Sequence, residues 1–224
     1  MEDRRAFLER MAATAMLAAL PFSIDGSREF AALPAAPADE KWDLSWVNRV
    51  TGRYRGVFDV PAIDSGYGVW RAGVWRAQYV DVLKVRPADC SPVAVLRAGG
   101  IPLAMQQGFW DEYGVGAANS VKHPVTEQPT DRNPALLSSS RNEVPAMFDA
   151  FALDRFIAGG GIALACNLAF ADMVGLVSKK HGGSEADARA KAVAMLVPGV
   201  ILQPSGVFAV MRAQDAGCKY MRVS

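Results

Sequence analysis

Short apolar runs alternate along the chain with longer segments in which apolar residues recur at helical spacing. Most of the short runs lack a polar face and are typical of strands buried on both sides of a sheet. They occupy residues 54–60, 91–100, 161–166, 199–204 and 218–223. The helical segments occupy residues 69–85, 101–114, 143–159, 167–181, 184–197 and 205–217. This alternation predicts an α/β sandwich, in which helices cover both faces of a parallel sheet.

Local signals mark the boundaries of these elements. Asn167 stands where the N-cap of helix 167–181 is expected. Ser184 and Asp187 have the spacing of a capping box at the next helix. Residues 115–141 are rich in Pro, Asn, Ser, Thr and charge, so we expect a long loop there. Long loops inside compact domains are often functional or mobile.

The first residues have the pattern of an export signal. The sequence Arg-Arg-x-Phe-Leu at positions 4–8 precedes an Ala-rich apolar run at 11–22. This order resembles a twin-arginine signal peptide, and the small residues at 36–38 suit its cleavage site. The alternative is an amphipathic N-terminal helix. The signal predicts a periplasmic protein that loses residues 1–38 and keeps residues 39–224 as one domain.

Composition and charge exclude several classes of partner. The 224 residues are 51% hydrophobic and 21% charged, which is ordinary for a globular domain. The formal net charge is +1 and like charges do not form blocks, so nothing indicates nucleic acid binding. The apolar run at 11–22 is too short to cross a bilayer, so we expect no transmembrane span in the mature chain.

The three cysteines, Cys90, Cys166 and Cys218, are divided between the two edges of the predicted sheet. Cys90 and Cys218 lie where strands begin, whereas Cys166 ends its strand. A disulfide needs Cα atoms within about 7 Å, and a flavodoxin-type strand order would also separate Cys90 from Cys218. We therefore expect three free thiols. There is no CxxC and no zinc-ligand spacing, so we expect no metal and no cofactor.

Cys166 is the candidate catalytic residue because of its position. It lies at the carboxyl edge of the sheet, where α/β proteins bind ligands, and directly before helix 167–181, whose dipole favours a thiolate. Asp59 and Arg97 end the first two strands and are expected to converge on the same edge. Arg97 favours a thiolate and Asp59 opposes it. The alternative is a buried, space-filling cysteine among Ala and Leu.

Asp59, Arg97 and Asn167 are the candidate binding residues beside Cys166. Two more residues are candidates for binding, each with an ordinary alternative. Trp110 is either a wall of a pocket at the carboxyl edge or a core residue, since aromatic residues at helical spacing usually pack inside. His123 lies in the long loop and could serve as an acid, a base, or a haem or metal ligand. The alternative is a loop residue without such a role.

Helix 69–85 carries apolar residues on two opposite faces, one marked by Trp70 and the other by Trp75. One face should meet the sheet. The second is either exposed, which predicts a homo-oligomer, or covered by the long loop or the N-terminal lead-in.

Several segments together resemble the DsrE/DsrF-like family in its exported branch. They are "VPAIDSGYGVWRAGVWRAQY", "SPVAVLRAGGIPLAMQQGFWDEYGVG" and the C-terminal "AVAMLVPGVILQPSGVFAVMRAQDAGCKYMRVS". The likeness covers most of residues 56–223. The resemblance implies a three-layer α/β sandwich with a mainly parallel five-stranded sheet, and assembly into trimers or larger oligomers. Cytoplasmic members relay sulfur as a cysteine persulfide, and "LACNLAF" places Cys166 at a comparable strand-to-helix junction.

Two functions follow from these observations. The first is a sulfur or thiol carrier that uses Cys166, with a small-molecule or sulfur-carrying partner. The second is an extracytoplasmic binding or assembly module that keeps the fold without the chemistry. A Cys166 sulfur sealed beneath apolar side chains favours the second.

Overall fold

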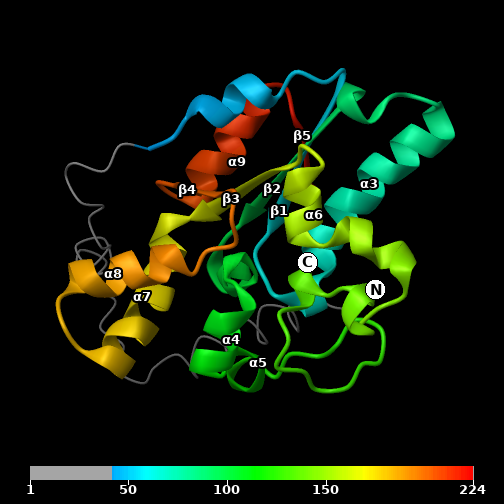
Figure 1. Ribbon diagram of the computed structural model, residues 1–224. Helices are drawn as coiled ribbons and strands as arrows, with labels where there is room; N and C mark the ends of the chain where they lie inside the picture. Colours follow the sequence, from blue (N-terminus) through cyan, green and yellow to red (C-terminus); the bar gives the residue numbers. More distant parts are fainter. Residues whose placement is uncertain (1–41, 224) are drawn as a thin grey trace, which may run out of the picture. The chain divides into compact units, whose positions relative to one another are not determined.

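A five-stranded, all-parallel sheet forms the centre of the protein, as the alternating pattern predicts. The computed structural model describes residues 42–223, so the predicted signal at 1–38 lies outside the described residues. The strands run in the order β4-β3-β2-β1-β5. Their bounds are β1 Tyr54–Val60, β2 Cys90–Leu96, β3 Ile162–Cys166, β4 Val200–Gln203 and β5 Lys219–Arg222. The chain winds from β1 outward to β4, and its last strand returns to pair with the first (Figure 1).

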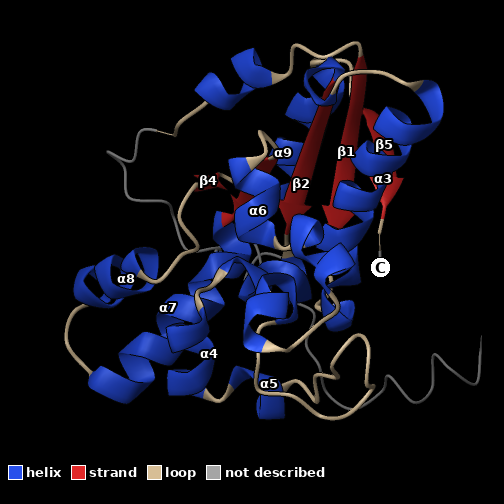
Figure 2. Ribbon diagram, turned by 45° about the vertical axis from the view of Figure 1, so that its right-hand side comes forward, coloured by secondary structure: helices blue, strands red, loops and turns tan. Residues whose placement is uncertain are grey.

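Helices cover both faces of this sheet, which makes the fold a three-layer α/β sandwich (Figure 2). The α-helices are α3 Tyr67–Leu83, α4 Gln107–Tyr113, α5 Val115–Ala118, α6 Leu153–Ala158, α7 Asn167–His181, α8 Glu185–Ala194 and α9 Gly206–Asp215. The 3-10 helices are η1 Ser45–Arg49, η2 Asp64–Gly66, η3 Pro87–Asp89, η4 Ala98–Ala104, η5 Pro134–Leu136, η6 Ser139–Arg141 and η7 Ala146–Phe151.

Alternate residues of each strand point to opposite layers, so the two faces have separate cores. Val57 of β1 and Val95 of β2 pack beneath α9 and η1. Phe58 of β1 and Leu96 of β2 pack on the other face, with α3, α4, α6 and α7. The unbroken apolar runs of the sequence reflect burial on both sides.

Two predicted helices are each divided in the structure. The segment 101–114 forms η4 and then α4, and Pro102 inside η4 cannot donate a helical hydrogen bond. The segment 143–159 forms η7 and then α6, because Ala152 between them is extended. Helix α7 has the predicted bounds, although its N-cap is Cys166 and Asn167 is its first residue.

The second apolar face of α3 is covered rather than exposed. Trp70 is buried with Leu137 and Val144, and its ring stacks on Phe148 with ring centroids 4.8 Å apart. On the opposite side Trp75 packs against Phe58 of the sheet. The end of the long loop and the segment that follows it thus cover this face of α3. Of the two alternatives for this face, the covered one is confirmed. The predicted homo-oligomer loses this support and stays a prediction.

Within residues 42–223, no helix is both long enough and apolar enough to cross a membrane.

A close backbone approach positions η4 against the end of β1. A Cβ atom at Gly100 would meet the carbonyl oxygen of Val60, whereas one at Gly108 in α4 meets nothing within 4 Å. We predict that Gly100→Ala lowers the free energy of unfolding by about 1–3 kcal/mol through overpacking. Gly108→Ala is the matched control and should raise it by about 0.5–1 kcal/mol. Urea unfolding of both variants checks this, and equal effects would contradict it.

Candidate functional site

Three of the predicted site residues end neighbouring strands at the carboxyl edge of the sheet. Asp59 lies near the end of β1, Arg97 directly follows β2, and Cys166 ends β3. Asp59 and Arg97 each lie two residues beyond a side chain that packs beneath α9, so both point to the α9 face. Cys166 departs from this alternation and joins the apolar cluster on the opposite face. Arg97 and Cys166 follow the paired residues Leu96 and Ala165, which makes them neighbours across the sheet.

Asp59 and Arg97 form a bidentate ion pair. Arg97 Nε donates to Asp59 Oδ1 at 2.6 Å, and Arg97 Nη2 donates to Oδ2 at 2.8 Å. The Asp59 side chain is 2% exposed and that of Arg97 is 31% exposed. Burying a carboxylate to this extent is costly unless it is paired and hydrogen-bonded, and Arg97 supplies both. Asp59 binds the Nε and Nη2 groups of the guanidinium, so Nη1 of Arg97 is not part of this pair.

Tyr220 of β5 completes the network, and the sequence interpretation missed it. Its hydroxyl donates to Asp59 Oδ2 at 2.8 Å. The hydrogen bonds that Arg97 donates to Asp59 hold the pKa of Arg97 above its usual range, with smaller contributions from Tyr220 and Cys166. The hydrogen bond to Asp59 likewise raises the pKa of Tyr220, so the phenol stays a donor. Side chains alternate between the two faces along β5, but this places Tyr220 beside Asp59 only once β5 is known to pair with β1.

Cys166 is part of the hydrophobic core. It is 6% exposed and belongs to the apolar cluster that includes Phe170 of α7. It is a free thiol and the N-cap residue of α7. Asn167, which we expected as the cap, is buried instead, and its side-chain oxygen accepts no hydrogen bond from any described residue. The site therefore presents a packed sulfur rather than an open one.

The other two thiols lie at the opposite edge, as predicted. Cys90 opens β2 and Cys218 directly precedes β5, and β1 separates these two strands. All three cysteines are free and buried. The strand order is not of the flavodoxin type, so the wide separation of Cys90 from Cys218 expected for that order does not apply. Burial raises the pKa of Cys90 and raises that of Cys218 to about 11.

Trp110 and His123 do not join this site. Trp110 is fully buried in the core, and its indole N–H donates to the Pro102 carbonyl at 2.8 Å. His123 holds its own turn: its Nδ1 accepts from the backbone N–H groups of Val125 and Thr126, both at 3.2 Å. Trp110 is therefore a core residue, the second of its two alternatives, and the contacts of His123 serve local loop structure. Within residues 42–223, no three His, Cys, Asp or Glu side chains form a metal-binding group.

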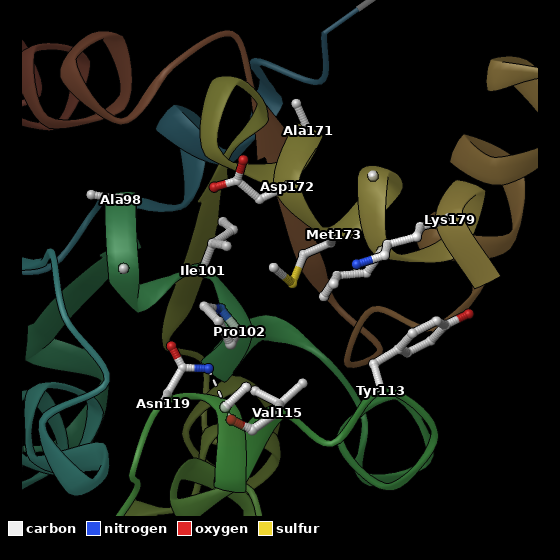
Figure 3. Close-up of a pocket in the computed structure, with 14 residues that line it drawn as sticks. Ala98, Ile101, Pro102, Tyr113, Val115, Asn119, Ala171, Asp172, Met173 and Lys179 are labelled. Atoms are coloured by element: carbon white, nitrogen blue, oxygen red, sulfur yellow. Dashed lines mark hydrogen bonds between the residues drawn. The ribbon is translucent and has the colours of Figure 1, made fainter.

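A cavity of about 500 Å³ lies beside this edge, bounded by η4, α4, α5 and α7 (Figure 3). Its floor is apolar and includes Ile101, Pro102 and Met173, while Asp172 and Lys179 of α7 supply charge. This volume is within the range of small-molecule sites, and the carboxyl edge of a parallel sheet is where such sites usually lie. Cys166 is not among the lining residues.

Comparisons with known proteins give no relative: no protein-family model matches the chain, and neither a curated protein nor a solved structure does so.

Removing the charge of Asp59 should cost stability because it leaves the Arg97 guanidinium without its ionic partner. We predict that Asp59→Asn lowers the free energy of unfolding by about 1–3 kcal/mol at neutral pH. Asp81→Asn is the matched control, since its ion pair with Lys84 is solvent-exposed and should contribute less than about 1 kcal/mol. Urea titration of both variants measures the difference, and similar losses would show that the Asp59 pair adds little.

The buried thiol of Cys218 makes stability depend on alkaline pH. Its pKa in the folded protein is about 11, above the usual value of about 8.5. The folded state therefore holds the thiol proton more tightly than the unfolded state, and protonation of Cys218 stabilises the fold. This contribution is complete below the unfolded pKa and is lost as pH rises toward the folded pKa. Cys218→Ala removes it, so the stability difference between wild type and variant should shrink from about pH 8 to about pH 10.5. Unfolding at several pH values tests this, and a constant difference would contradict it.

Proposed function

We propose that the protein is an exported, DsrE/DsrF-like binding protein that holds a small molecule in the cavity between η4 and α7. In this proposal Cys166 is a packing residue and carries no sulfur. The family assignment is supported by the sequence segments described above and by a five-stranded parallel sheet with helices on both faces.

The observation that carries the proposal is the separation of the thiol from the cavity. The cavity has the size and the mixed lining of a small-molecule site, and Cys166 does not contribute to it. The thiol is nearly sealed and packs within the cluster that holds Phe170. A sulfur carrier must expose its sulfur to a donor and an acceptor, whereas a binding module has no such need.

A sulfur or thiol carrier is the second candidate, and one contact favours it. The guanidinium of Arg97 interacts electrostatically with Cys166, its neighbour across the strand ends. Cys166 is also the N-cap residue of α7, a helix of 15 residues, whose N-terminus favours negative charge. Against it, Asp59 already binds Arg97 through two hydrogen bonds, which offsets much of the positive charge.

Export and assembly remain proposals that rest on the sequence. The paired arginines before an Ala-rich apolar run support a periplasmic location, reached by the twin-arginine route. The resemblance to the DsrE/DsrF-like family supports a homo-oligomer.

Alkylation of the native protein separates the two candidate functions. We expect iodoacetamide at neutral pH to label Cys166 no faster than Cys90 or Cys218, because all three sulfurs are buried. Peptide mass spectrometry at successive times gives a rate for each cysteine. The protein unfolded in urea is the control, since its three thiols should then react at similar rates.

A clear excess at Cys166 would overturn the binding-module proposal. If Cys166 in the native protein labels at least about tenfold faster than both other cysteines, its thiolate is accessible and the carrier function takes precedence.

A further inference from the structure

We propose that the cavity between η4 and α7 binds a small zwitterion with an apolar body, in the manner of an ω-amino carboxylate. This inference rests on the proposed binding function and specifies its ligand class. The ammonium group of the ligand faces Asp172, its carboxylate faces Lys179, and its apolar chain lies on the floor between them.

The two charged side chains of the cavity are free to receive such a ligand. Asp172 and Lys179 both line it, and neither forms a hydrogen bond or an ion pair with any residue between 42 and 223. The neighbouring Lys180, by contrast, is bound to Glu112. In Figure 3 the Lys179 amino group points toward Met173, and the Asp172 carboxylate lies at the opposite end, on the side of Ala98.

The spacing of the two charges selects an elongated molecule. They are seven residues apart on one helix, which places them on the same face with about 10 Å of axial rise between their Cα atoms. That distance is too great for the two side chains to neutralise each other by direct contact. A ligand whose opposite charges are separated by a chain of similar length can form an ion pair with Asp172 at one end and with Lys179 at the other.

The remaining lining agrees with this orientation. Ile101, Pro102 and Met173 supply an apolar surface that favours a hydrocarbon chain over a sugar or a nucleotide. Asn119 uses its Nδ2 to donate to the Val115 carbonyl at 2.8 Å, so its Oδ1 stays an acceptor for a ligand donor. The hydroxyl of Tyr113 is directed to His181, at 3.1 Å from Nε2, and leaves the ring to form a wall.

Binding of three probes to the full chain tests the inference. The probes are ω-aminocaprylate, caprylate and octylamine, which carry both charges, the anion alone and the cation alone. Titrations followed by ligand-observed NMR give their dissociation constants. We expect ω-aminocaprylate to bind at least about fivefold more tightly than either singly charged probe, since it gains a second ion pair.

Two charge-removing variants assign each end of the ligand. Asp172→Asn should abolish the advantage of ω-aminocaprylate over caprylate and leave caprylate binding unchanged. Lys179→Gln should abolish its advantage over octylamine and leave octylamine binding unchanged. Asp81→Asn and Lys84→Gln make the same charge changes on an exposed pair at the C-terminal end of α3 that does not line the cavity, and should have no effect.

A blocked cavity distinguishes failure of the ligand class from failure of the binding function. Gly175 lines the cavity and a Cβ atom there meets nothing within 4 Å, so Gly175→Trp fills the space without a clash at its base. If the probes bind wild type but not this variant, without preference for the zwitterion, the ligand class is wrong and the binding function stands. If no probe binds wild type more tightly than the blocked variant, both proposals fail.

Discussion

The bidentate pair between Asp59 and Arg97 is the constraint on which the carboxyl edge depends. A carboxylate this deeply buried is costly unless it is paired and hydrogen-bonded. Arg97 meets that need from β2, and its stem lies against Gly206 at the start of α9, where a Cβ atom would come within 2.6 Å of the Arg97 side chain. The ends of two strands and the beginning of a helix are therefore held together by one charge pair.

The same residue directs the chain into the wall of the cavity. The Arg97 backbone N–H donates to the Val60 carbonyl at 3.1 Å, and its own carbonyl accepts from Gly100 at 2.8 Å. η4 begins directly after Arg97 and continues along the cavity. The ion pair on one face of the sheet and the cavity beside α7 thus share a single backbone segment. The cavity at this edge therefore opens without exposing the thiol of Cys166.

The sequence predicts the strands and α7 well because their signals are local. Unbroken apolar runs and the glycines that end α7 require no knowledge of tertiary contacts. The proximity of Asp59 to Arg97 follows from their place at strand ends. Three features depend on distant segments and were not predicted: the hydroxyl of Tyr220 on Asp59, the cover of Trp70 by Phe148, and the cavity itself. The burial of Cys166 was not predicted either, because a cysteine between a strand and a helix can be exposed or packed with the same local sequence.

The pairing of the last strand with the first has a consequence for the order of folding. The hydrogen bond between Tyr220 and Asp59 joins residues 161 positions apart. Contacts of such long range form late, because the entropy of closing the intervening loop must be overcome first. During synthesis β1 remains an open sheet edge, and the carboxylate of Asp59 lacks its phenol, until β5 emerges from the ribosome. An unpaired edge of this kind is a site for premature association. The C-terminal strand therefore both closes the open edge of β1 and completes the hydrogen bonds of Asp59.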